Sequence, residues 1–263
     1  MTSRRLIVTA DDFGLSTAVN DAVERAHREG ILTTASLMVG ADASQDAVGR
    51  ARSLPGLHVG LHVVVVNGRP VLPPERVPDL VDAHGQFPSR LGHAGVTFFW
   101  NARAREQLEA EIRAQFEAFA RTGLALDHVN AQNHMHVHPT VLGLILKVGR
   151  DYGMQAVRLP YERSSRWSTA LGLAPWLRLM RARLDRAGLA HNDYVLGMRD
   201  TGRMTRTRVL ALLDTLAPGV TELYFHPEIG NEEFAALIDP DVVRKVRDAG
   251  ITCVHFNELA DAS

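Results

Sequence analysis

The chain has 263 residues, a formal net charge of −1 and a pI near 6.9. This near-neutral charge gives no electrostatic reason to expect nucleic-acid binding. A membrane-spanning helix needs about 18 consecutive apolar residues, and no apolar run in the sequence is that long. The single cysteine, Cys253, excludes a disulfide framework, and the first residues lack the features of a signal peptide, so we expect a cytoplasmic protein.

Short apolar runs alternate with segments of helical periodicity along most of the chain, which is typical of repeated βα units. The first run ends at Asp11 and Asp12, and a helix is expected from Ser16 to Gly30. Further strands are expected at 33–39, 58–66, 126–133, 156–159, 194–198, 222–226 and 251–256. Further helices are expected at 44–53, 108–123, 139–153, 205–216 and 239–250. Seven or eight such units predict an α/β fold, a single-domain distorted (β/α) barrel over residues 1–263.

Two segments interrupt the alternation. Residues 67–104 are rich in proline and glycine and are expected to form a long loop or cap after the third strand. Residues 163–192 are expected to be a helical insertion after the fifth strand, and in 163–189 two tryptophans and several leucines lie among arginines. Such a helix either packs on the barrel or lies on a membrane surface. The second interpretation predicts a peripheral contact with the inner membrane.

Polar side chains gather where three expected strands end. Asp11 and Asp12 end the first strand, His62 follows in the third, and the stretch 128–139 is rich in histidine. Side chains alternate along a strand, so one face of the fourth strand would carry a polar set: Asn130, Gln132, His134 and His136. Adjacent aspartates can also simply form a turn. The carboxyl ends of parallel strands meet at one edge, however, and we expect the three clusters to converge on one metal ion.

Taken together, these motifs resemble those of the YdjC/ChbG-like carbohydrate deacetylases. The resemblance covers nearly the whole chain and rests on Thr-Ala-Asp-Asp-Phe-Gly at 9–14, Gly-Leu-His at 60–62, the histidine-rich block at 128–139 and Phe-His-Pro at 225–227. The form of the histidine-rich block, together with Val-Arg-Leu-Pro-Tyr-Glu at 157–162, is most similar to the hopanoid-biosynthesis branch, HpnK.

The resemblance implies metal-dependent removal of the acetyl group from an N-acetylglucosaminyl unit, with a hopanoid glycolipid as the favoured carrier. It assigns Asp12 and His62 as metal ligands, Asp11 as general base and His226 as general acid. A divalent ion would polarise the amide carbonyl and activate water, a free carboxylate would take the proton, and an imidazole would protonate the departing amine. Substrate contacts are expected from residues near this site: Phe13, Arg158 and Glu162.

One position departs from the family pattern. The third ligand is usually a histidine, and Gln132 occupies its place. A glutamine carbonyl coordinates a hard ion such as Mg²⁺ but binds Zn²⁺ more weakly than an imidazole does. Three explanations remain open: His134 replaces the missing ligand, the site binds Mg²⁺ with the help of water, or the exchange disables the site. His58 and His255 match no family position and are expected to be packing residues.

Several functions therefore compete. The favoured one is the N-deacetylase. Its expected partners are an amino-sugar or glycolipid substrate and, in a homo-oligomer, further copies of the same chain. A chitooligosaccharide deacetylase is the alternative within the same class. A catalytically silent sugar- or lipid-binding protein is motivated by Gln132. A glycoside hydrolase that uses Asp11 and Asp12 ranks last, because adjacent residues on one strand seldom flank a substrate as that mechanism requires.

Overall fold

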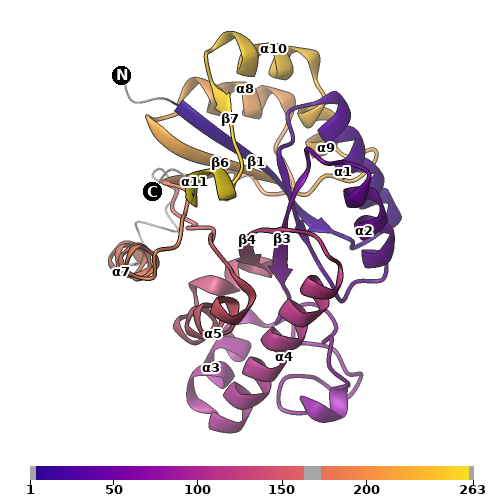
Figure 1. Ribbon diagram of the computed structural model, residues 1–263, viewed down its shortest axis with the longest axis vertical. Helices are drawn as coiled ribbons and strands as arrows, with labels where there is room; N and C mark the ends of the chain where they lie inside the picture. The colour runs from indigo at the N-terminus through magenta and orange to yellow at the C-terminus, as the bar shows by residue number, and fades with distance from the viewer. Residues whose placement is uncertain (1–3, 163–172, 261–263) are drawn as a thin grey trace.

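A computed structural model describes residues 4–162 and 173–260. Its centre is a curved sheet of parallel strands with helices packed around it (Figure 1). The strands run in the order β4-β3-β2-β1-β6-β5, with β7 beside the start of β1. Their bounds are β1 Arg4–Phe13, β2 Thr34–Leu37, β3 His58–Val63, β4 Leu126–Ala131, β5 Tyr194–Leu196, β6 Gly219–Phe225 and β7 Thr252–Cys253. This half-barrel confirms the predicted α/β barrel-like fold.

The gap between β4 and β5 is spanned by an irregular segment. A strand was expected at 156–159, but the structure has only isolated bridges there, Val129 to Val157 and Ala156 to Ala190. Further on, the Val195 N–H donates to the Tyr161 carbonyl at 2.9 Å. The segment therefore continues the curve of the sheet without forming a regular ladder, and this is what distorts the barrel.

The helices cover the outside of the sheet. Their bounds are α1 Thr17–Glu29, α2 Ser44–Arg52, α3 Leu91–Trp100, α4 Ala102–Arg121, α5 Pro139–Gly149, α7 Leu173–Arg186, α8 Arg206–Asp214, α9 Glu232–Leu237, α10 Pro240–Asp248 and α11 Asn257–Ala260, with 3-10 turns at Pro74–Arg76, Gln132–Val137 and Arg150–Tyr152. Helix α1 begins where Ser16 Oγ accepts from the Val19 N–H. It ends at Gly30, where a Cβ would lie 2.2 Å from the Leu237 carbonyl oxygen.

The first expected insertion is more ordered than the sequence indicated, and the described part of the second contains the expected helix. Residues 67–104 contain α3 and one 3-10 turn in addition to loop. In the second insertion, residues 163–172 lie outside the described residues, whereas α7 packs on the barrel. Its Leu177, Met180 and Leu184 are buried, and Trp176 Nε1 donates to the Val137 carbonyl at 2.7 Å. These side chains of α7 are therefore covered by protein, and the membrane contact expected for 163–189, part of which lies outside the described residues, stays a prediction.

No helix in the described ranges is both long enough and apolar enough to cross a bilayer.

Candidate functional site

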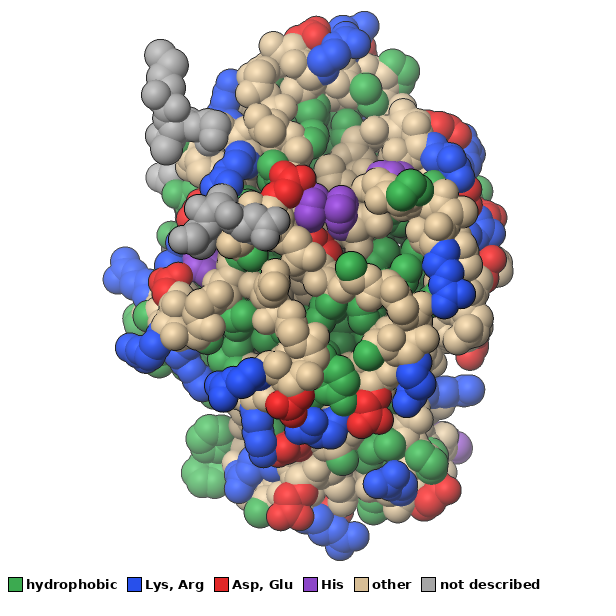
Figure 2. Space-filling view, viewed as in Figure 1, with side chains coloured by type: hydrophobic (Ala, Val, Ile, Leu, Met, Phe, Trp, Pro, Cys, Tyr) green, Lys and Arg blue, Asp and Glu red, His purple; other side chains and the backbone are tan. Residues whose placement is uncertain are grey.

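A cavity of about 550 Å³ opens at the carboxyl ends of the strands. The two residues predicted to be catalytic and the four predicted metal ligands all line it: Asp11, Asp12, His62, Gln132, His134 and His226. In Figure 2, histidine side chains gather near the centre of the visible face, with an acidic side chain beside them. The parallel sheet thus brings together side chains that lie more than 200 residues apart in the sequence.

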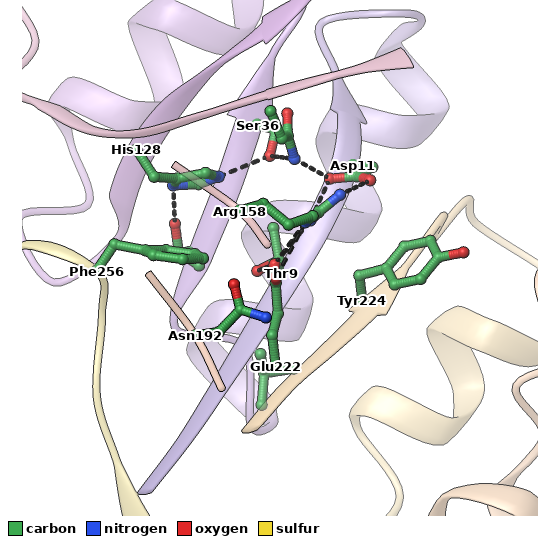
Figure 3. Close-up of polar contacts among 12 residues, drawn as sticks. Thr9, Asp11, Ser36, His128, Arg158, Asn192, Glu222, Tyr224 and Phe256 are labelled. Atoms are coloured by element: carbon green, nitrogen blue, oxygen red, sulfur yellow. Dashed lines mark hydrogen bonds and ion pairs between the residues drawn. The ribbon is translucent and has the colours of Figure 1, made fainter. Parts of the chain in front are cut away.

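The carboxylate of Asp11 forms an ion pair with a buried arginine, Arg158. Arg158 Nη1 and Nη2 donate to its two carboxylate oxygens at 2.7 and 2.9 Å, and Nη2 also donates to Glu222 Oε1 at 2.7 Å (Figure 3). Thr9 Oγ1 adds a further bond to Glu222, at 2.6 Å. Burial raises the pKa of Asp11, but the charge and hydrogen bonds of Arg158, together with the nearby His62 and His226, outweigh burial and hold that pKa well below its usual value. Asp11 is consequently ionised at every pH near neutrality.

Asp12 also lines the cavity, but it differs from Asp11 in backbone conformation and in hydrogen bonding. Its backbone has φ 63°, a left-handed conformation that a non-glycine residue rarely adopts, and its buried Oδ1 has no hydrogen-bond partner. That oxygen lies 3.3 Å from His62 Nε2, while His62 Nδ1 lies 2.7 Å from Asn130 Oδ1. Burial lowers the pKa of His62, but the contact with Asp12, the charge of Asp11 and the bond to Asn130 together outweigh burial, so that the pKa is raised. The pair requires a cation between them, either a proton or a metal ion.

The predicted continuation of the fourth strand is wrong beyond Ala131. Residues Gln132–Val137 form a 3-10 turn in which Asn133 and His134 have left-handed φ values of 51° and 53°. The alternation of side chains along a strand therefore does not predict where the side chains of 132–137 point. His134 still reaches the cavity, with Nε2 3.4 Å from Tyr224 Oη. His136 does not line it, and its Nδ1 accepts from the Ala131 N–H at 3.1 Å. Burial lowers the pKa of His134 to about 3, so its ring is neutral.

Three donor groups at the cavity are compatible with a divalent ion. Asp12 Oδ1 and Gln132 Oε1 are buried and lack partners, and His62 Nε2 lies beside the first of them. Two oxygens and one imidazole nitrogen form a set that suits Mg²⁺ better than a set rich in nitrogen or sulfur would. His134 Nδ1 is a fourth buried atom without a partner. The residues present therefore fit the metal that the family resemblance implies.

The residues predicted to touch substrate lie elsewhere. Phe13 and Arg158 are fully buried, and neither lines the cavity; Phe13 belongs to the hydrophobic core. Glu162 is also buried and outside the lining, with Oε1 3.3 Å from the Gly197 N–H. In this structure, side-chain contact with substrate is open instead to residues that the sequence had not indicated, among them Arg199 and Tyr224.

A second group of donor atoms lies at the opposite end of the strands. His58, Asp127 and His255 bring theirs within 4.8 Å of one another, close enough to hold a metal ion. His58 begins β3, and Asp127 is the second residue of β4. The rings of the two histidines, both expected to be packing residues, are stacked with centroids 3.3 Å apart and planes within 7°. Because the lone pairs of parallel rings do not converge, one ring must turn before both could bind one ion.

Comparisons with known proteins agree with this geometry. A family model described as YdjC-like protein matches residues 5–249. The chain is 31% identical to a carbohydrate deacetylase of Geobacillus stearothermophilus, over 97% of this chain and 98% of that protein. It is 40% identical to a carbohydrate deacetylase of Brevibacillus brevis, but that match covers only 60% of each chain. A crystal structure from Enterococcus faecalis V583, of a protein assigned to cellobiose-phosphate cleavage, superposes with a TM-score of 0.79 at 26% identity, covering 98% and 99% of the two chains.

Proposed function

Because this chain belongs to the YdjC-like family, we propose that it is a carbohydrate N-deacetylase, a hydrolase that releases acetate from an N-acetylated amino sugar. The observation that carries the proposal is the difference between two adjacent carboxylates. Asp11 is fixed and ionised by Arg158, whereas Asp12 presents a buried oxygen without a partner to the cavity. One carboxylate can thus accept a proton while its neighbour helps to hold a cation.

The reaction requires water to attack the acetamide carbonyl, so that a C–O bond forms, the C–N bond breaks, and acetate and a free amine result. A divalent ion held by Asp12, His62 and Gln132, when bound, supplies polarisation of the carbonyl. Asp11 accepts the proton of the attacking water. The low pKa of Asp11 makes its carboxylate a weak base. The same low pKa keeps the carboxylate ionised near neutral pH, so that it is free to accept a proton.

The departing nitrogen must receive a proton before the C–N bond breaks. His226 lies across the cavity from β3, at the end of β6, with its ring one-third exposed. Its backbone N–H donates to Glu233 Oε2 at 2.5 Å, which fixes the turn that carries the ring. An imidazole in this position can deliver a proton to the amine. We therefore assign the acid role to His226.

The test is product analysis with an N-acetylglucosamine-terminated saccharide and added Mg²⁺ or Zn²⁺. We expect equal amounts of acetate and free amine, and a loss of at least about 100-fold in kcat for Asp11→Asn, since a positioned base contributes about 10²–10⁴-fold. Release of free sugar without acetate would instead identify a glycoside hydrolase. Saccharide binding with no product would identify a silent binding protein, the alternative that Gln132 favours.

For the substrate we propose a glycolipid, with the N-acetylglucosaminyl group of a hopanoid as the favoured case and a soluble chitooligosaccharide as the alternative. Helix α3 supports this choice. It carries no Asp, Glu, Lys or Arg between its ends, and four of its apolar side chains are exposed: Leu91, Val96, Phe99 and Trp100. Leu91 also lines the cavity. The first residue of the helix therefore borders the cavity.

Exposed apolar side chains that cluster in this way are typical of a surface that binds an apolar partner. The described residues include seven large hydrophobic side chains that are exposed, and four of them lie on α3. Trp100 is 75% exposed, and Arg103 beside it is also mostly exposed, a combination that suits the boundary between lipid and water. The apolar part of a glycolipid would be removed from water by contact with this surface, which favours burial.

A further inference from the structure

We propose that the chain has a second metal site, for Zn²⁺, at the amino-terminal ends of β3 and β4. Its ligands are His58, Asp127 and His255, whose donor atoms lie within 4.8 Å of one another. His58 lies four residues before His62 on β3, and a strand rises about 3.3 Å per residue, so the two sites are roughly 13 Å apart along the sheet. The second site therefore shares no ligand with the cavity and does not depend on the proposed function.

The three side chains form a donor set that favours zinc. Two imidazoles and one carboxylate, with water in the fourth position, are an established ligand set for Zn²⁺. Mg²⁺ prefers oxygen ligands, so this set differs from the oxygen-rich one at the cavity. Both histidines are partly exposed, whereas Asp127 is 1% exposed. An ion that enters from solvent past the histidines therefore meets a buried carboxylate.

The carboxylate of Asp127 is already aimed at the histidine pair. Its Oδ2 lies 3.0 Å from His128 Nδ1, and its Oδ1 accepts from the Asn257 N–H at 3.1 Å. Oδ1 also lies 2.8 Å from His255 Nδ1. Carboxylates that bind metal ions are commonly held by hydrogen bonds of this kind, which fix the direction of the ligand atom. Oδ1 is thus the oxygen that Asp127 presents to an ion.

His255 has the second partner that is typical of a metal-binding histidine. Its Nε2 lies 3.0 Å from Glu258 Oε1, while its Nδ1 faces Asp127. A ligating histidine almost always directs its other ring nitrogen at a carboxylate, a backbone carbonyl or water. An ion between Nδ1 and Asp127 Oδ1 replaces the hydrogen bond there, and the proton leaves to solvent. The contact with Glu258 keeps the ring in place.

The backbone on either side of this ligand is fixed on β4. Phe256 follows His255, and its ring is stacked on His128 with centroids 4.5 Å apart (Figure 3). Asn257 Nδ2 donates to the Leu126 carbonyl at 3.3 Å. The position of His255 relative to β4 is therefore set before an ion arrives, and only a small adjustment of its ring is needed.

His58 is the ligand that has to move. Its ring is stacked on His255, with centroids 3.3 Å apart and planes within 7°, so the lone pairs of the two rings run parallel and do not meet. The backbone of His58 is held by β2, because its N–H donates to the Thr33 carbonyl at 3.2 Å. The ring itself is partly exposed. Rotation to another side-chain rotamer therefore brings a ring nitrogen toward the ion while the strand stays in place.

A bound ion would join three distant parts of the chain. His58 lies on β3, Asp127 on β4, and His255 between β7 and α11, so the C-terminal segment becomes tied to the middle of the sheet. A ligand that binds only the folded state stabilises that state. At a free Zn²⁺ concentration about 100-fold above Kd, we expect the melting temperature to rise by about 5–10 °C.

The test is isothermal titration of the metal-free chain with Zn²⁺ in excess Mg²⁺, together with melting curves. His58→Phe keeps a flat ring for the stack on His255 but has no ligand nitrogen. We expect it to bind one Zn²⁺ fewer than the natural chain and to lose the rise in melting temperature. Glu258→Gln changes only the second partner of His255, at a half-exposed side chain, and should weaken this Zn²⁺ by about 10- to 100-fold.

His84→Phe is the matched control, because it makes the same exchange at an exposed histidine outside the site. It should bind as many Zn²⁺ ions as the natural chain. The proposal is overturned if His58→Phe binds Zn²⁺ in the same number and with the same affinity as the natural chain, or if His84→Phe loses an ion as well. Absence of acetate release would refute the proposed function and leave this count unchanged, so the two failures are distinguishable.

Discussion

Arg158 and Asp11 meet in a bidentate ion pair that is withdrawn from solvent, with Nη1 2.7 Å from Oδ2 and Nη2 2.9 Å from Oδ1. The same guanidinium also bonds to Glu222, so one cation serves two buried carboxylates. An arginine can do this because its planar fork presents several donors in fixed directions. Lysine carries the same charge but cannot make the same set of bonds.

This geometry predicts that Arg158→Lys is not a conservative change. Lysine keeps the charge but leaves carboxylate oxygens of Asp11 and Glu222 without a donor, and a buried polar group without a partner costs about 1–3 kcal/mol, so we expect Arg158→Lys to lose at least that much unfolding free energy. Urea denaturation measures it. Arg103→Lys is the control, since Arg103 makes a surface ion pair with Asp79 and is 72% exposed. Equal unfolding free energies for the two variants would contradict the interpretation of Arg158 as the buried centre.

Gln132→His tests the choice of metal. The natural side chain offers a neutral oxygen, which suits Mg²⁺, whereas an imidazole favours Zn²⁺. We expect the variant to bind Zn²⁺ at least about tenfold more tightly than the natural chain, and to gain less for Mg²⁺. Isothermal titration with each ion measures the difference. If the variant gains no affinity for Zn²⁺, position 132 does not reach the ion, and His134 is then the residue to substitute next.

The sequence predicted much of the fold and of the site because both follow from local patterns. Buried parallel strands appear as short apolar runs, and their ends are marked by polar residues that a core cannot hold. The placement of Asp11, Asp12 and His62 at one edge follows from this rule alone. These three side chains line one cavity in the structure.

The remainder depends on contacts between distant residues and on backbone conformations that have no periodicity. The 3-10 turn after Ala131 contains two non-glycine residues with positive φ, which no pattern of apolar residues indicates. Arg158 was expected at the rim of the site, but it is buried because Glu222, 64 residues away, supplies a second carboxylate. The one available signal was a glutamate inside the apolar run that became β6.

Asp193 predicts how stability depends on pH. Its Oδ2 accepts from the Val220 N–H at 3.0 Å, and its Oδ1 pairs with Arg181 on α7 at 3.0 Å. Burial raises its pKa, but these two bonds outweigh burial and lower it. A carboxylate whose pKa is lowered in the folded state stabilises the fold above its unfolded pKa of about 3.9 and loses that contribution as the pH falls through the folded value.

We therefore expect Asp193→Asn to be less stable than the natural chain at neutral pH, and its melting temperature to fall less steeply in acid below about pH 4. Melting curves from about pH 2 to 7 measure both effects. Arg181→Gln removes one of the two partners and should give an intermediate slope. If Asp193→Asn keeps the full slope, other carboxylates are responsible for the loss of stability in acid.

The surface of α3 predicts a difference between lipid-linked and soluble substrates. Phe99 and Trp100 are 46% and 75% exposed, so replacing both by serine removes little packing from the folded chain. A tenfold change in kcat/KM corresponds to about 1.4 kcal/mol, which burial of roughly 60 Å² of apolar surface supplies at about 25 cal/mol per Å². We expect the double variant to lose at least about tenfold in kcat/KM toward an N-acetylglucosaminyl lipid, and to remain within about twofold for a chitooligosaccharide.

Leu179→Ser is the matched control, because Leu179 is 49% exposed on α7 and does not line the cavity. An equal loss on both substrates would assign these residues to the fold, and no loss on either would show that α3 does not bind the lipid.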